Sequence, residues 1–110
     1  MLRKLLPFLT LTAVLSAPLA ANAASFHVRN DTGGTIAYLQ VSPAENDYWS
    51  HADEMLGSDQ YIHPGETWDF DFAAGDDCVF DMRAVFTNGR SITRYNVDFC
   101  AYSSPIWTLY

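Results

Sequence analysis

The chain has 110 residues, of which thirteen are acidic and six basic, and its formal net charge at pH 7 is −7. This length is sufficient for one small domain. The acidity disfavours nucleic acid and anionic lipid surfaces as partners, because the electrostatic contribution that dominates such binding would be repulsive. Cations and basic proteins remain compatible partners. Acidity also keeps a small domain soluble, and we expect a monomer.

Residues 1–23 have the pattern of a secretory signal peptide. Arg3 and Lys4 precede an apolar stretch, and Ala21-Asn22-Ala23 matches an A-x-A cleavage site. Pro, Thr and Ser interrupt the stretch and no stop-transfer pattern follows, so we expect no membrane span in a mature form that begins at Ala24. Four arginines and thirteen acids remain after cleavage, a formal net charge of −9. We expect a periplasmic or secreted domain over residues 24–110.

A β-hairpin is predicted between Cys78 and Cys100. The Asn88-Gly89 pair lies between two runs rich in β-branched and aromatic residues, which is the strongest short-range hairpin signal. Counting outward from a two-residue turn places Phe80 opposite Val97. The same register places Arg83 opposite Arg94 on the polar face.

Two arginines that face each other cost stability unless a carboxylate lies between them. Asp81 and Asp98 are the natural counter-ions for Arg83 and Arg94, and a structural ion network is the simpler reading. The alternative is that the arginine pair receives an anionic group of a ligand.

The two cysteines are predicted to form one structural disulfide. The register places Cys78 opposite Phe99, so a small bulge or a strand end brings Cys100 within reach. An exported chain enters an oxidising compartment, and a whole hairpin rather than a C-x-x-C spacing separates the pair. Closing such a loop stabilises the fold by roughly 3 kcal/mol in the chain-entropy model.

Alternation of apolar and polar residues predicts further strands. The first two, at 25–30 and 35–42, are expected to pair as a hairpin across the turn 30–34. A third, at 67–72, directs Trp68, Phe70 and Phe72 inward and Asp69 and Asp71 outward, and the last lies at 106–110. The pattern indicates an all-β fold, a small antiparallel β-sandwich or open barrel of about six to seven strands with one short helical turn.

Residues 43–60 form the longest stretch without strand patterning. Ser50-x-x-Asp53 resembles a capping box and Gly57 suits the C′ position, so a helical turn is expected over 52–56. A loop of this length is either functional or anchored by its own apolar residues. Two readings stay open. Either Tyr48 and Trp49, beside several acids, form a binding site, or Trp49 and its apolar neighbours Met55 and Leu56 cap the core.

Signals for catalysis and metal binding are weak. His27, His51 and His63 lack transition-metal spacing, and no EF-hand pattern surrounds the acids Asp47, Asp53, Glu54, Asp59, Asp76 and Asp77. Asp69 and Asp71 share one strand face, as exposed acids commonly do. The cysteines are expected to be bridged, and no serine lies in G-x-S-x-G. We therefore expect no enzyme, no metal and no cofactor.

Several short motifs together resemble a family. They are Asn30-x-Thr32-Gly33, Leu39-x-Val41-Ser42-Pro43, Trp49, Leu56-Gly57, Pro64-Gly65, Cys78-x-Phe80-Asp81-x-Arg83, Asn88-Gly89 and Asn96-Val97-Asp98-x-Cys100. Over almost the whole mature chain they resemble small exported single-domain β proteins of bacteria, mostly proteobacteria, of uncharacterised function. The resemblance implies a compact β fold and a cell-envelope setting, and it implies no activity.

We therefore expect a non-catalytic module that binds an envelope protein or a glycan. The alternatives are a β domain that binds Ca²⁺ or a small ligand, and an inhibitor of an envelope hydrolase. The candidate binding residues are Tyr48, Trp49, Asp53, Glu54, Arg83 and Arg94.

Overall fold

The structure is a computed structural model that describes residues 23–110, so the predicted signal sequence lies outside the described residues, apart from Ala23. The fold is all-β, as predicted. Its elements are β1 (Ala23–Asn30), β2 (Ile36–Pro43), the 3-10 helix η3 (His51–Asp53), β3 (Thr67–Ala73), β4 (Val79–Phe86), β5 (Ser91–Asp98) and β6 (Ile106–Leu109). Among these residues, no helix has the length and apolar character needed to cross a membrane.

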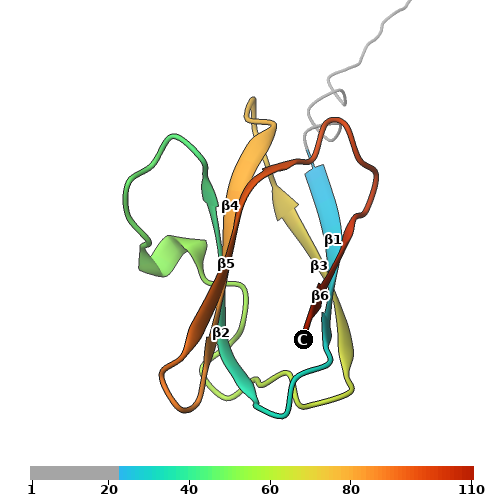
Figure 1. Ribbon diagram of the computed structural model, residues 1–110. Coiled ribbons are helices and arrows are strands. Elements are labelled where there is room, and N and C mark those ends of the chain that lie inside the picture. Colours follow the sequence, from blue (N-terminus) through green and yellow to red (C-terminus); the bar gives the residue numbers. More distant parts are fainter. Residues whose placement is uncertain (1–22) are drawn as a thin grey trace, which may run out of the picture.

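The strands form two three-stranded sheets, β3-β1-β6 and β2-β4-β5, which face each other (Figure 1). β1 is antiparallel to β3 and parallel to β6, so one pair departs from the expected antiparallel arrangement. The predicted hairpin between the first two strands is wrong, because β1 and β2 belong to different sheets. Asn30, fully buried at the end of β1, donates its side-chain amide to the carbonyls of Gly34 and Ile62 and holds the crossing turn.

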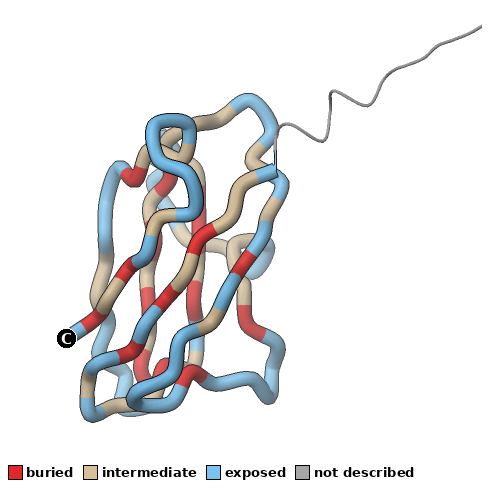
Figure 2. The backbone as a smooth tube through the Cα atoms, turned by 90° about the vertical axis from the view of Figure 1, so that its right-hand side faces the viewer, coloured by how far each residue is buried: buried red, intermediate tan, exposed pale blue. Residues whose placement is uncertain are grey.

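The core lies between the sheets and takes apolar side chains from both. The predicted faces of β3 are confirmed: Phe70 is buried, its apolar neighbours pack on the core, and the intervening aspartates are exposed. Phe26 stacks on Phe70 at 5.2 Å between ring centroids within one sheet, and Phe72 meets Phe80 of the other sheet at 5.0 Å. Figure 2 shows buried positions alternating with less buried ones along the strands.

The predicted β4–β5 hairpin is confirmed, but its turn differs. The Phe86 N–H donates to the Arg90 carbonyl at 2.8 Å, and Gly89 has a φ of 89°. This is the pattern of a three-residue loop that ends in a left-handed glycine, not of a two-residue turn. The extra residue shifts the register by one, so Arg83 lies opposite Thr93 and the predicted opposition of two arginines is wrong.

A bulge restores the predicted register at the other end of the hairpin. The register shifts between Phe80 and Met82, and Asn96 takes a left-handed φ of 59° while its N–H donates to the Asp81 carboxylate at 2.9 Å. Beyond the bulge Phe80 pairs with Val97, as predicted. The three-residue loop shifts the pairing of the two strands by one residue, and the bulge shifts it back by one, so the two shifts cancel.

The Cys78–Cys100 disulfide is confirmed, with 5.2 Å between the Cα atoms. The Phe99 N–H donates to the Cys78 carbonyl at 2.8 Å, so these residues are opposite each other as the register predicts. The Asp98 carboxylate then accepts the N–H of Cys100 at 2.9 Å. This hydrogen bond turns the chain at the end of β5 and brings the second sulfur back to the first.

The segment between β2 and β3 covers the edge of β2. Gln40 forms a β-bridge with Glu54, and Ile36 forms one with Ile62. Unpaired backbone groups of an edge strand invite aggregation, so this covering protects the sheet. The expected helical turn is present but earlier, as η3, and Gly57 lies beyond its end with no positive φ.

Candidate functional site

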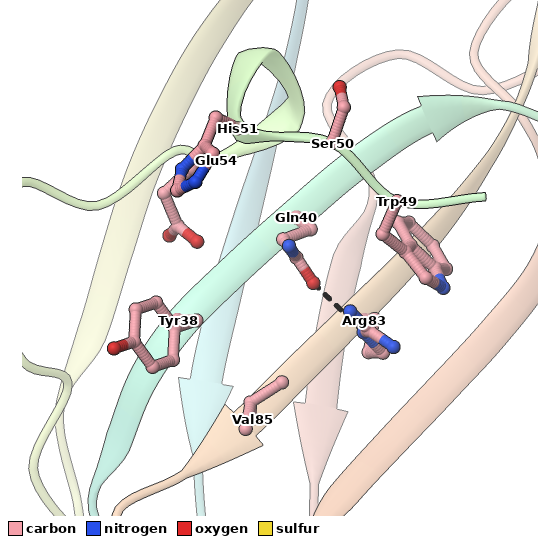
Figure 3. Close-up of a pocket in the computed structure, with 8 residues that line it drawn as sticks. All are labelled: Tyr38, Gln40, Trp49, Ser50, His51, Glu54, Arg83 and Val85. Atoms are coloured by element: carbon pink, nitrogen blue, oxygen red, sulfur yellow. Dashed lines mark hydrogen bonds between the residues drawn. The ribbon is translucent and has the colours of Figure 1, made fainter.

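A hollow of about 510 Å³ lies on the outer face of the β2-β4-β5 sheet (Figure 3). Alternate residues of a strand point away from the core, which places four outward side chains of β2 and β4 on its floor. The 43–60 loop passes over one side of this floor and forms the wall of the hollow. The lining residues are Tyr38, Gln40, Arg83 and Val85 from the strands and Trp49, Ser50, His51 and Glu54 from the loop.

Arg83 is held on the floor by two neighbours. Its Nε donates to the Gln40 side-chain oxygen at 2.8 Å, and its Cζ lies 4.9 Å from the centroid of the Trp49 ring. Gln40 and Arg83 are adjacent because they pair across β2 and β4. The hydrogen bond and the cation–π contact orient the guanidinium without neutralising it.

Further aromatic side chains lie beside this hollow. Tyr48 and Tyr95 line a neighbouring depression that shares Trp49 with the first. Tyr38, Tyr48 and Tyr95 are each more than half exposed, while Trp49 is partly buried. We call these four residues the outer aromatic face. The sheet of β3, β1 and β6 pairs mostly polar residues on its own outer side, for example His27 with Asp69.

The two loop acids proposed for binding have structural roles. The Glu54 Oε2 atom accepts the backbone N–H of Leu39 at 2.8 Å and that of Leu56 at 3.1 Å. Asp53 accepts the backbone N–H of Ser50 at 2.8 Å, as the predicted capping box requires. Glu54 nevertheless lines the hollow, whereas Asp53 does not.

Arg94 is separate from this site. The shifted register pairs it with Met82, a core-facing residue, so it lies on the opposite face of the sheet from Arg83. It lines another hollow beside the 98–105 connection. The predicted counter-ions are also wrong: within residues 23–110 neither arginine has a carboxylate within 4.0 Å. Asp81 and Asp98 accept backbone N–H groups instead.

A metal centre finds little geometric support. In the described part of the chain, the three-residue group Cys78, Asp98 and Cys100 is the one whose potential ligand atoms lie within 4.8 Å of one another. The sulfurs of this group are bonded to each other. His27 pairs with Asp69 and His63 with Glu66, so these imidazoles have protein partners.

Sequence reasoning found Trp49, Glu54 and Arg83 but missed the strand residues beside them. Tyr38, Gln40 and Val85 look like ordinary outward positions, and their importance comes from the loop that crosses above them. The signal that could have placed Tyr38 and Gln40 together on the outward face is their alternation with Leu39, which is buried.

No family model, curated protein or solved structure matches this chain. The resemblance to small exported bacterial proteins therefore stays a prediction, and the function is argued from the geometry of the site.

Proposed function

We propose that the mature chain is a non-catalytic binding module of the bacterial cell envelope, and that its ligand surface is the outer aromatic face with the Arg83 hollow. The observation that carries this proposal is the gathering of Tyr38, Tyr48, Trp49 and Tyr95 on one side of one sheet. Exposed Trp and Tyr side chains provide a large contact area at a low cost in conformational entropy, and binding surfaces are enriched in them.

The asymmetry between the two outer faces supports the same proposal. On the opposite sheet, Ile106 is an exposed apolar residue at an edge strand, and it pairs with His27 of β1. Three exposed tyrosines gather on the outer aromatic face, whereas the exposed Tyr61, Tyr102 and Tyr110 lie outside the strands. The hydrogen bonds of Glu54 and Asp53 to the backbone favour binding over catalysis, because both acids already stabilise the loop.

The disulfide supports the envelope setting, since such bonds persist in oxidising compartments. The expected export signal and the resemblance to exported bacterial proteins agree with this setting. We propose that the domain acts as a periplasmic or secreted monomer.

The experiment is capture from an envelope extract by immobilised mature protein. The extract is divided into a protein fraction and a polysaccharide fraction, and wild type is compared with the double variant Tyr38→Ala and Trp49→Ala. Ile106→Ala is the matched control, because it removes an exposed apolar side chain from the other sheet. Capture by wild type and the control but not by the double variant is expected. Equal capture by all three proteins would exclude this face.

A further inference from the structure

In the described part of the chain, the guanidinium of Arg83 has N–H donors without protein acceptors, which indicates that a ligand bound here would be negatively charged. Within residues 23–110, no carboxylate lies within 4.0 Å of it, and its one side-chain hydrogen bond uses Nε. The N–H groups on Nη1 and Nη2 therefore have no protein acceptor in this part of the chain.

The unused donors have the geometry that recognises a carboxylate. A guanidinium presents parallel N–H groups in a plane, and a carboxylate accepts them with two oxygens. Gln40 and Trp49 already hold this plane, so little side-chain entropy is lost when a ligand binds. Glu54 lines the same hollow, and its negative charge disfavours a doubly charged phosphate more than a singly charged carboxylate.

The rest of the hollow suits a hydroxyl-rich ring. Figure 3 shows Gln40 between Tyr38 and Arg83, with His51 and Glu54 above Tyr38 and Trp49 beside Arg83. Tyr38 and Trp49 present apolar rings, while Ser50, His51 and Glu54 can exchange hydrogen bonds with hydroxyl groups. The volume of about 510 Å³ lies within the range of roughly 300–1,000 Å³ typical of small-ligand sites.

We infer that the Arg83 hollow binds an acidic saccharide, with the carboxylate of a uronate on the Arg83 guanidinium and the sugar ring between Tyr38 and Trp49. This inference rests on the proposed function and names its ligand class. The net charge of the mature chain repels anions at long range, so affinity comes from these short-range contacts. An acidic peptide offers the same carboxylate but lacks the ring hydroxyls that the wall of the hollow can bind.

Isothermal titration calorimetry on the mature protein at physiological ionic strength, which screens the long-range repulsion more than the close contact, tests this inference. The probes are an oligogalacturonate, a neutral galactose oligomer of the same length, and a short acidic peptide. A hydrogen-bonded charge pair predicts that the oligogalacturonate binds about ten- to a hundredfold more tightly than the neutral oligomer. Arg83→Gln is expected to remove this preference. Arg83→Lys, which retains the charge but not the fork, is expected to lose most of it.

Arg94→Gln is the matched control, because it removes the same charge from a different hollow, and it is expected to retain the preference. Circular dichroism of each variant verifies folding. Equal affinity for the acidic and neutral oligomers overturns the acidic ligand but leaves the binding face intact. Tighter binding of the peptide overturns the saccharide class. No binding of any probe by a wild type that still captures envelope material overturns the inference without touching the proposed function.

Discussion

The side-chain amide of Asn30 donates a hydrogen bond of 2.9 Å to the backbone carbonyl of Ile62. Asn30 is fully buried at the end of β1, and Ile62 in turn pairs with Ile36 at the start of β2. The Asn30 side-chain oxygen also accepts the Thr32 N–H at 3.0 Å. One side chain thus joins the turn between the sheets to the segment that covers the β2 edge.

Asn30→Ala is expected to destabilise the fold by about 2–4 kcal/mol, because it removes the hydrogen bonds of a fully buried side chain to Gly34, Ile62 and Thr32 and leaves the Thr32 N–H without its partner. Thr32→Ala, which removes one neighbouring hydroxyl, is the milder comparison. Chemical denaturation of both variants measures the difference. A loss of less than about 0.5 kcal/mol for Asn30→Ala would show that water replaces its hydrogen bonds.

Replacing Cys78 and Cys100 together by Ser is expected to cost roughly 2–5 kcal/mol, the usual range for a small secreted domain. The bond closes a loop with a sequence separation of 22 residues. Mass spectrometry of the purified mature protein is expected to find no free thiol. Two free thiols in the native protein would contradict the disulfide itself.

Phe70→Ala is expected to destabilise by about 3–5 kcal/mol, since Phe70 is buried against Phe26. Asp71→Ala on the exposed face of the same strand is expected to change stability by less than about 0.5 kcal/mol. Urea unfolding of the two variants provides the comparison. Similar losses in both would be incompatible with the faces of β3.

Substitutions of Trp49 and Leu56 distinguish the two interpretations of the 43–60 loop, a binding site or a cap on the core. Leu56 is buried in the core, so Leu56→Ala is expected to cost about 2–4 kcal/mol. Trp49 lies outside the core and packs on Arg83, so Trp49→Ala is expected to cost less than about 1 kcal/mol. Thermal unfolding distinguishes the two. A loss for Trp49→Ala as large as that for Leu56→Ala would identify the tryptophan as a core cap.

Glu66 contributes a pH-dependent stabilisation. Hydrogen bonds lower the pKa of the Glu66 carboxyl below its ordinary value of 4.5. The backbone N–H of His63 has the largest effect, and the indole N–H of Trp68 has the next largest. A group whose pKa is lower in the folded state stabilises the fold above its unfolded pKa, and this contribution is lost as the pH falls through the folded value. The stability difference between wild type and Glu66→Gln is therefore expected to be present at pH 7 and to shrink below about pH 4.5. Denaturation at several pH values measures it, and a constant difference would contradict the mechanism.

The sequence alone determined the features that depend on local pattern. Alternation located β3 and its inward face, and Asn88-Gly89 located the hairpin. The spacing of the cysteines around that hairpin identified the disulfide. These predictions succeeded because side-chain alternation, turn geometry and chain connectivity act over a few residues.

Tertiary structure decided everything that depends on which strands become neighbours. Asn30 directs the turn after β1 across the sandwich, so β1 and β2 do not pair, although each has a clear strand pattern. A single residue in the Thr87–Gly89 loop placed Arg83 and Arg94 on opposite faces, because side chains alternate with a period of two. The hollow exists only because the 43–60 loop returns over β2, and the bridge between Gln40 and Glu54 joins residues far apart in sequence. No local pattern encodes that contact, since it depends on the packing of the whole domain.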